Sequence, residues 1–467
     1  MTLALGLQVT LRAGEMPAHI PAHVDQLVGA NRAAERVDGG PIDRALSKWA
    51  GAFRVTSAFP ARGALGRVGA QNAGYDDREH LHGLSRTVRI RLRDGSHVRD
   101  ALAALRDLRA VEFARPETLG RTPAPMALTT PCTPVPGHEL VRAHRALPYG
   151  DERVIVAIVD SGVAMGHPEL QRKLLAGYDT VDLGWGRVGD LELIGNSRGH
   201  DFNPRDEVGH GSHVAGVIGA QGFRVPRGIA GRSLILPLRV LAAAMGPHAT
   251  RPVGIGGLSD IDCGLKVACD LGAKVINMSF GTGERSLDPD APPPHREVID
   301  YAVSLGVILV AAMGNTGDSE RLYPAAHPDV IAVGAVDGEL RPCAFSTRGK
   351  HCALAAPGDR IYSLDLHGYR CSSGTSHAAP FVSGAAARLV AYARSRGVDL
   401  DGRDIRRLLT TSAQARPKDG PDDAIGHGVL DVGAAFALLR DELARDPGKR
   451  NAARARRPGE PWGEVRG

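Results

Sequence analysis

Residues 154–160 read VIVAIVD, six apolar positions that end on a carboxylate. Four more strand-like runs follow: LILPLRVL (234–241), KVINMSFG (274–281), VILVAAMGN (307–315) and VIAVGAVD (330–337). Stretches of helical character lie between them, near 211–220, 259–271 and 295–305, and a last one runs from about 375 to 394. Continuous apolar strands alternating with helices are typical of a parallel sheet covered on both faces. We therefore predict a doubly wound, mostly parallel α/β domain.

Polar residues stand where these predicted strands end and where helices begin. Asp160 closes the first strand, Asn315 closes the fourth, His210 begins a helix in DEVGHGSHVAGVIGA, and Ser376 begins another in SSGTSHAAPFVSGAAARLV. In a doubly wound sheet, the ligand crevice lies outside the carboxyl ends of the strands. We expect these four side chains to meet there.

This combination of side chains suits acyl transfer. A serine hydroxyl is a weak nucleophile near neutral pH, so a neighbouring base must take its proton during attack. Histidine is such a base, and a carboxylate on its other nitrogen orients the ring and stabilises its protonated form. We therefore assign Ser376 as nucleophile, His210 as general base and Asp160 as its orienting carboxylate. The negative oxygen of the intermediate would be bound by the Ser376 N–H and the Asn315 amide.

Each of these residues taken alone has an ordinary structural explanation. Asp160 and Asn315 could be turn residues, and Ser376 could be a helix cap. His210 is one of 18 histidines, and its neighbour His213 is assigned a structural role. Only the combination of the four, each at a strand end or a helix start, favours catalysis.

Four blocks resemble the signature blocks of the subtilisin-like (subtilase) family, in that family's order: AIVDSGVAMGHPEL, GHGSHVAG, VAAMGN and GTSHAAP. The resemblance spans about 140–440. It implies a subtilisin-like fold and a serine endopeptidase that works through an acyl-enzyme. It also implies that Asp160, His210 and Ser376 form the catalytic triad, that Asn315 is the oxyanion donor, and that the chemistry requires no cofactor.

The resemblance also implies how protein or peptide substrates bind. Their backbone would pair with a strand at 279–281, flanked by a weaker second strand near 256–257. The pocket for the residue before the scissile bond would be lined by 311–314 and 322–325, and we expect it to accept apolar side chains. The expected substrate contacts are Ser279, Phe280, Gly281, Gly314 and Leu322.

Calcium is common in the family, and the loop DFNPRDE (201–207) carries possible oxygen ligands. These are Asp201, Asn203, Asp206 and Glu207. Solvated loop carboxylates explain the same pattern, so a structural calcium ion stays open and no metal ligand is assigned.

The N-terminal part contains a second, smaller unit. TVRIRLR (87–93) alternates apolar residues with arginines and predicts a half-buried strand, which a helix over 98–105 and a strand near 111–113 follow. The unit resembles the later part of a subtilase propeptide, which implies a self-processing zymogen cleaved between about 117 and 140. The expected domains are a 1–48 extension without assigned role, a 49–118 propeptide-like α+β domain, a 119–138 proline-rich linker, a 139–440 peptidase domain and a 441–467 basic tail.

Composition limits the other classes of function. The 57 basic residues exceed the 52 acidic ones by only 5, which does not indicate a nucleic-acid partner. No apolar run is long enough to span a bilayer, and residues 3–11 make a poor signal peptide. The compartment stays open, with secretion favoured by the family resemblance, and we expect a monomer. Cys343 and Cys352 flank a short loop and could form a disulfide, or could be small buried apolar residues.

Two alternative functions remain. A scaffold or binding protein on the same fold would lack a member of the triad, and none is missing here. A processing protease for one partner is the other alternative, because the proline-rich loop LDPDAPPP (287–294) could restrict access to the cleft. Cleavage of a panel of unstructured proteins would separate broad from narrow specificity.

Overall fold

The computed structural model describes residues 2–15, 19–23, 32–64, 74–93, 95–123, 133–146 and 150–445. Its main body is built on a seven-stranded sheet with the order β17-β16-β14-β12-β5-β9-β6, in which all neighbouring strands are parallel. The strands are β5 (Ile155–Asp160), β6 (Tyr178–Asp179), β9 (Leu234–Arg239), β12 (Val275–Met278), β14 (Ile308–Ala312), β16 (Val330–Val336) and β17 (Cys352–Pro357).

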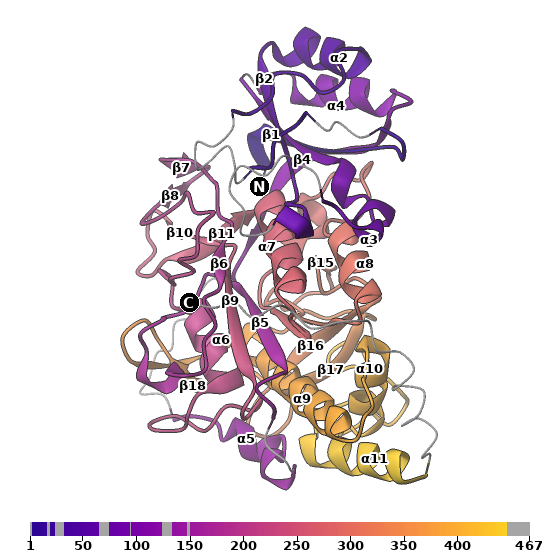
Figure 1. The fold of residues 1–467 in the computed structure, drawn as a ribbon. Helices are drawn as coiled ribbons and strands as arrows, with labels where there is room; N and C mark the ends of the chain where they lie inside the picture. Colours follow the sequence, from indigo (N-terminus) through magenta and orange to yellow (C-terminus); the bar gives the residue numbers. More distant parts are fainter. Residues whose placement is uncertain are drawn as a thin grey trace.

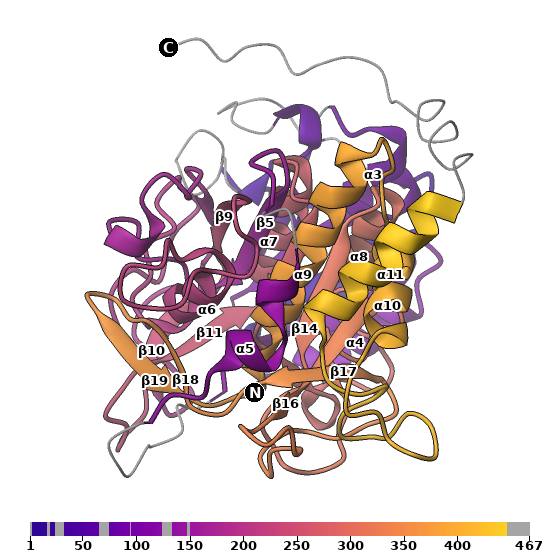
Figure 2. The same ribbon diagram turned by 90° about the horizontal axis from the view of Figure 1, so that it is seen from below.

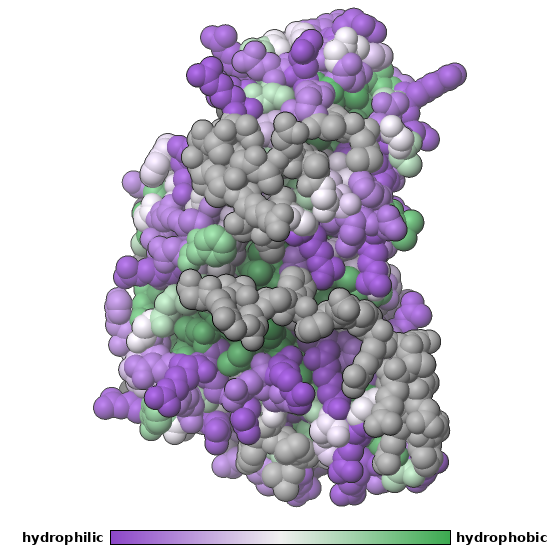
Figure 3. All heavy atoms as spheres, in the orientation of Figure 1, coloured by the Kyte–Doolittle hydropathy of each residue, from purple (hydrophilic) through white to green (hydrophobic). Residues whose placement is uncertain are grey.

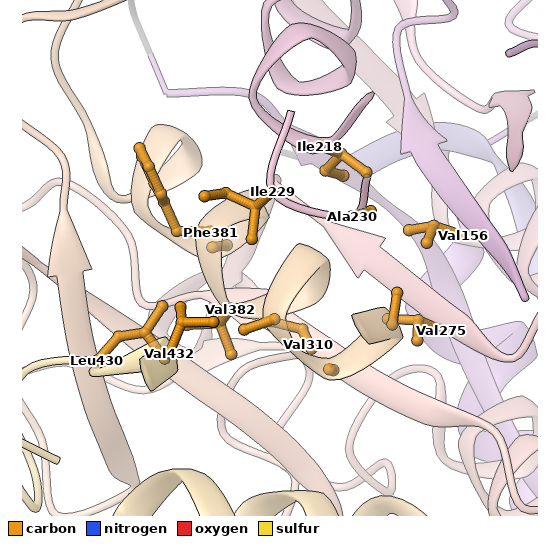
Figure 4. Packing of buried hydrophobic residues seen from close by; sticks show 14 of the residues in the cluster. Val156, Ile218, Ile229, Ala230, Val275, Val310, Phe381, Val382, Leu430 and Val432 are labelled. Carbon is orange, nitrogen blue, oxygen red and sulfur yellow. The ribbon is translucent and has the colours of Figure 1, made fainter. Parts of the chain in front are cut away.

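Helices cover both faces of this sheet (Figures 1 and 2). One face carries α6 (His210–Gly219) and α9 (Thr375–Ser395), with α10 (Gly402–Thr411) and α11 (Val432–Arg445) beside α9, and the other carries α7 (Leu258–Asp270) and α8 (Arg296–Ser304). Along β5, Val156 and Ile158 pack into the first core layer while Ala157 and Val159 pack into the second, as the period of two requires. Figure 4 shows part of the first layer, where side chains of β5, β12 and β14 gather with those of α6 and α9. The predicted α/β architecture is confirmed.

A second sheet contains eight strands in the order β2-β3-β1-β4-β11-β10-β8-β7, all neighbours antiparallel. Its strands are β1 (Thr2–Leu11), β2 (Phe53–Ser57), β3 (Thr87–Leu92), β4 (Val111–Arg121), β7 (Arg187–Val188), β8 (Leu191–Leu193), β10 (Ala242–Met245) and β11 (Val253–Gly257). The first four, with α2 (Pro41–Ala50) and α4 (Val98–Arg106), enclose a core of their own. This N-terminal unit lies at the top of Figure 1 and joins the main body through β4 and β11.

The N-terminal segment differs from the expected extension. β1 lies between β3 and β4, and α2 begins at Pro41, so residues before 49 build the sheet and core of the N-terminal unit. The pattern was missed because both faces of β1 are buried: Leu7 and Val9 face the core, and Gln8 and Thr10 are buried as well. At the other end, β4 runs to Arg121, so the first three residues of the expected linker belong to a strand. Residues 124–132 of that linker and 446–467 of the expected tail lie outside the described residues.

The arginine face of β3 is only partly solvated: Arg91 is exposed as a half-buried strand requires, but Arg89 is buried. Arg89 is 7% exposed and pairs with Asp260 of α7 at 2.5 Å. A second buried ion pair joins Glu79 of the N-terminal unit to Lys266 at 2.6 Å. Arg115 of β4 adds contacts of 3.4 Å to Asp262 and Glu297. Charged side chains therefore hold the N-terminal unit against α7 and α8.

The proline-rich loop 287–294 contacts the same unit. Arg106 pairs with Asp288 at 2.7 Å, and the Arg115 side chain donates to the Pro293 carbonyl at 3.4 Å. These contacts place the loop against α4 and β4. Among the described residues, no contact supports the expectation that the loop itself restricts access to the cleft.

The smaller elements border the cleft or the surface. They are α3 (Asp77–Leu81), α5 (Gly137–Leu140), β13 (Thr282–Gly283), β15 (Leu322–Tyr323), β18 (Ile361–Leu364) and β19 (Tyr369–Ser372). Hydrophilic side chains cover much of the face in Figure 3, with hydrophobic ones gathered across its middle. Within the part of the chain that the structure describes, no helix has the length and apolar character needed to cross a membrane.

The cysteines do not form the disulfide that was considered. Cys343 and Cys352 are both buried free thiols, and the Cys352 Sγ lies 3.7 Å from the carbonyl oxygens of Leu354 and Ala424. They therefore act as small apolar residues. Cys371 on β19 is disulfide-bonded.

Candidate active site

Asp160 and His210 meet at the carboxyl edge of the parallel sheet. The His210 Nδ1–H donates to Asp160 Oδ1 at 2.7 Å, and the Ser161 N–H donates to the same oxygen at 2.7 Å. Asp160 is fully buried, whereas His210 is 8% exposed. Because Nδ1 carries the proton that bonds to the carboxylate, Nε2 of the neutral ring is left as the proton acceptor.

Gly211 allows helix α6 to approach the end of β5 this closely. A Cβ at this position would overlap the Gly162 carbonyl oxygen and lie 3.2 Å from Asp160 Cβ. Any side chain here would push the start of α6 away from the strand that carries Asp160. The glycine therefore has a steric role in the geometry of the pair.

Asp206 fixes the loop before His210, a role that the sequence did not reveal. Its two oxygens accept hydrogen bonds of 2.7–2.9 Å from Ser161 Oγ, from Ser212 Oγ and from the backbone N–H groups of residues 208, 209 and 212. Ser212 Oγ in turn accepts from the Ala164 N–H at 2.8 Å. Burial raises the pKa of Asp206, although these hydrogen bonds favour its charged form.

The calcium ligands considered for 201–207 do not converge. The oxygens of Asp206 are taken up by the loop, and Glu207 pairs with Arg239 at 2.9 Å. Asp201 accepts from the Asn203 N–H at 2.8 Å. Among the described residues, no group of three or more His, Cys, Asp or Glu side chains is arranged to hold a metal ion. The residues present at this loop do not fit a calcium site.

Ser376 lies in the first turn of α9, opposite Ser279. Its hydroxyl donates to the Ser279 carbonyl at 3.1 Å, and Ser279 Oγ donates to the Ser376 carbonyl at 3.0 Å. Ser376, His210 and Asn315 line one pocket. In this structure the Ser376 hydroxyl donates its hydrogen bond to Ser279, so it has to give up this bond before it can donate to His210.

The Asn315 side chain is oriented by Thr375, a second residue that the sequence did not reveal. Asn315 Oδ1 accepts from both the N–H and the Oγ1–H of Thr375, each at 2.9 Å. Because Thr375 holds Oδ1, the other end of the amide, Nδ2, faces Gly374 just before α9. A Cβ atom added to Gly374 would lie 2.8 Å from Nδ2. Gly374 thus keeps open the space beside the amide donor.

Two further histidines lie close to His210 but are buried. His213 Nε2 lies 3.1 Å from the Ile361 carbonyl, and His377 Nε2 lies 2.8 Å from Ser372 Oγ. Burial lowers the pKa of both well below the ordinary value. Both rings are therefore neutral near pH 7, consistent with the structural role assigned to His213.

The expected substrate residues lie next to one another beside this pocket. Leu322 Cδ2 lies close to both Gly281 and Gly314. A Cβ atom added to these glycines would be 3.2 and 2.8 Å, respectively, from Leu322 Cδ2. Phe280 is 2% exposed and packs into the core, so its backbone, not its ring, is available to the cleft.

The end of β4 occupies the groove between the two strands expected to bind substrate. On one side it pairs with β11, with Leu119 opposite Gly257, Gly120 opposite Gly256 and Arg121 opposite Ile255. On the other side Arg121 and Gly281 exchange two backbone hydrogen bonds, of 3.2 and 3.1 Å. Thr122 and Pro123 then reach the pocket that His210 and Ser376 line.

Comparisons with known proteins find similar sequences and a similar fold. The model of the subtilase family matches residues 151–428. A thermophilic serine proteinase of Bacillus sp. (strain AK1) is 36% identical over 241 residues, 51% of this chain and 53% of that protein, so the chain matches about half the length of that relative. Subtilisin DY of Bacillus licheniformis is 32% identical over 307 residues, 64% of this chain and 97% of its own. A solved structure of the protease domain of PatA, in a serine-to-alanine mutant, is similar with a TM-score of 0.51 and 30% identity, over 63% of this chain and 97% of that chain.

Proposed function

The chain belongs to the subtilase family of serine-type endopeptidases, and on this premise we propose that it hydrolyses peptide bonds in proteins through Ser376, His210 and Asp160. The observation that carries the assignment is the 2.7 Å hydrogen bond between His210 and Asp160 in a pocket that Ser376 and Asn315 also line. Segments far apart in the sequence bring these four groups together, which the ordinary roles of single residues do not explain.

Attack begins when the Ser376 hydroxyl turns from the Ser279 carbonyl towards His210 Nε2. The oxygen forms a bond to the substrate carbonyl carbon while its proton passes to Nε2. The ring then carries a positive charge, which the buried Asp160 carboxylate stabilises through its bond to Nδ1. Asp206 and Gly211 act on this step only by holding the start of α6.

The tetrahedral intermediate places a negative charge on the former carbonyl oxygen. Asn315 Nδ2 is one donor for it, because Thr375 holds the other end of the amide. The Ser376 N–H is the second, since N–H groups in the first turn of a helix have no partner within the helix. Both donors are fixed before the reaction, which makes them effective.

His210 completes both halves of the reaction. Protonated on Nε2, it gives the proton to the departing amine, which leaves an ester between the substrate acyl group and Ser376. A water molecule then attacks this ester while Nε2 takes up its proton. As the bond between the acyl carbon and Ser376 Oγ breaks, Nε2 gives this proton to Oγ, which releases the acid and restores the hydroxyl. Protein groups alone supply this chemistry, and no cofactor takes part in it.

We further propose that the N-terminal unit is an inhibitory prodomain removed by self-processing between about 117 and 140. Support comes from the end of β4, which lies in the groove as an extended substrate would. In an antiparallel ladder, residues that exchange two hydrogen bonds recur every second position. The Arg121–Gly281 pair therefore sets residue 123 opposite Ser279, with the peptide bond after Pro123 nearest to Ser376.

Labelling with a fluorophosphonate probe tests the catalytic assignment. The wild-type protein should be labelled and should cleave an unfolded protein such as casein, whereas Ser376→Ala should do neither. Mass spectrometry of the purified chains tests self-processing separately. An identical intact N-terminus in wild type and Ser376→Ala would contradict it.

The disulfide at Cys371 supports a secreted protein, because such bonds persist in oxidising compartments. Together with the family resemblance, it leads us to propose export from the cell. Detection of the protein only inside the cell, with Cys371 reduced, would contradict this proposal.

A further inference from the structure

The residues on both sides of His210 are glycines, and side chains of other segments hold their backbone. Gly209 has a φ of +84°. Glycine adopts positive and negative φ with similar ease, so the local sequence alone does not fix the direction of the His210 backbone. The Gly211 N–H donates to Ser161 Oγ at 3.0 Å, and the Gly209 N–H donates to Asp206 Oδ1 at 2.9 Å. The remaining polar group is the Gly209 carbonyl, which belongs to the same planar peptide unit as the His210 nitrogen.

Arg370 of β19 holds this carbonyl. Its Nη2 group donates to the Gly209 oxygen at 3.0 Å, and the His213 N–H donates to the same oxygen at 3.2 Å. The bond from His213 lies within α6, whereas the bond from Arg370 connects the start of α6 to another element. β19 ends at Ser372, and the chain then leads into α9 and Ser376. The arginine therefore joins the segment that carries the nucleophile to the segment that carries the base.

The surroundings of Arg370 fix its guanidinium in this position. The side chain is 14% exposed and lines the same pocket as His210 and Ser376. Asp365 pairs with it at 4.0 Å and pairs with Arg251 at 3.2 Å. The backbone at Gly209 is packed against this pair, because a Cβ at that position would overlap Asp365 Oδ1.

A neutral side chain would be less costly than arginine at this place. Taking a cation out of water is unfavourable unless close partners compensate for it. Burial lowers the pKa of Arg370, although the charge of Asp365 opposes this shift. Methionine would fill a similar volume without this cost, but it could not donate to the Gly209 carbonyl. The hydrogen bond to that carbonyl, which the positive charge strengthens, therefore explains the arginine.

We propose that Arg370 is a positioning residue for the reaction, whose guanidinium fixes the peptide unit between Gly209 and His210 and so directs Nε2 of His210 towards the Ser376 hydroxyl. Arg370 acts through His210 and takes up no proton itself. Proton transfer needs the two atoms at hydrogen-bond distance, and small displacements of a catalytic group slow a reaction strongly. The inference rests on the proposed function, since it requires His210 to act as the base.

Kinetics of the processed enzyme on a peptide substrate test this role, with active sites counted by fluorophosphonate labelling. Arg370→Met should lower kcat roughly 10- to 100-fold with little change in KM, because the substrate still binds while the base is misplaced. Arg370→Lys should keep more activity than Arg370→Met, because an ammonium group can still donate to the carbonyl. Arg341→Met is the matched control, because it removes an exposed arginine that pairs with Asp337 at 3.0 Å, and it should match wild type.

Rescue by guanidinium ion separates positioning from a merely structural role. Guanidinium chloride at a non-denaturing concentration should enter the space left in Arg370→Ala and raise its kcat roughly fivefold, the equivalent of one hydrogen bond. Sodium chloride at the same ionic strength should not raise it. If Arg370→Ala does not fold, the comparison of Arg370→Met with Arg370→Lys decides, and equal kcat values for these two variants would overturn the proposal.

Two further results would also overturn it: a kcat of Arg370→Met equal to that of wild type, or a loss in a folded Arg370→Ala that guanidinium does not restore. In both cases wild type would still be labelled and active, so the proposed function would stand. Absence of labelling and cleavage in wild type itself would refute the proposed function, and the role of Arg370 with it.

Discussion

Replacing Pro123 with alanine should accelerate self-processing. The Arg121–Gly281 pair puts residue 123 opposite the Ser279 carbonyl, where a substrate N–H would donate. Proline has no N–H, and in the structure the Ser279 carbonyl accepts the Ser376 hydroxyl instead, at 3.1 Å. The proline therefore has two effects: the segment lacks one hydrogen bond to the groove, and the Ser279 carbonyl stays free to accept the Ser376 hydroxyl.

The size of the effect follows from one hydrogen bond. A backbone hydrogen bond is worth about 1 kcal/mol net in proteins, which corresponds to roughly a fivefold change in rate. The freed hydroxyl then has His210 as its remaining partner in the pocket, which adds to the gain. We expect Pro123→Ala to process roughly 5- to 20-fold faster than wild type.

Mass spectrometry of the full-length chain over time measures this rate and the position of the cut. Pro116→Ala is the control, because it removes a proline seven residues earlier, within β4 and outside the pocket. Pro123→Ala combined with Ser376→Ala should stay intact. If Pro123→Ala is processed no faster than wild type, or if Pro116→Ala accelerates processing equally, the reasoning from the ladder register is wrong.

Three further predictions concern the site and the interface. Asn315→Ala should lower kcat roughly 10²–10³-fold with little change in KM, a magnitude taken over from subtilisin, and full activity would remove the residue from the oxyanion site. Gly211→Ala should lower kcat strongly in a folded protein, because its methyl group overlaps the Gly162 carbonyl oxygen, whereas Gly166→Ala, which meets nothing within 4 Å, should leave activity unchanged. Burial, followed by the charge of Arg89, lowers the pKa of His23 to about 4, although its partner Asp182 opposes this shift. Because the ordinary pKa is about 6.5, docking of the N-terminal unit should be strongest above that pH and weaken as the pH falls towards about 4. Trypsin sensitivity after Arg121 measures this change in the Ser376→Ala chain, and a pH dependence unaltered by His23→Gln would contradict it.

The features that the sequence predicted are those set by local pattern. Each run such as 154–160 is apolar throughout because the strand is buried on both sides, and the polar residue that ends it marks the edge where the cleft lies. Asp160, His210, Asn315 and Ser376 could be proposed because each stands at such an edge or at a helix start. Each residue alone predicted little. The order of their motifs resembles that of one family, and this resemblance allowed the four residues to be assigned together as catalytic triad and oxyanion donor.

The features that were missed depend on contacts between distant segments. β1 was not recognised because its second face meets the main body, which removes the contrast between apolar and polar positions. For the same reason Arg89 suggested a solvated face, although its partner Asp260 lies 171 residues further along the chain. Asp206 was considered as a calcium ligand because it lies among acidic residues, and only the folded loop shows that its oxygens are taken up by backbone N–H groups.

These missed contacts add buried ion pairs to the apolar contacts of the N-terminal unit, where Phe59 and Leu84 join the core layer beside α7. Buried ion pairs are strong only while both partners are present, since a single buried charge without its partner is costly. Glu79 pairs with Lys266, which also pairs with Asp270 at 2.5 Å, so Lys266 keeps one partner when the unit leaves. Asp260, in contrast, faces Arg89, and burial raises the pKa of Asp260 to about 7. Loss of Arg89 would thus leave a carboxyl group that can take up a proton instead of staying charged. The main body can therefore release the N-terminal unit without keeping an unpaired buried charge at either position, which is the property that a removable inhibitory domain requires.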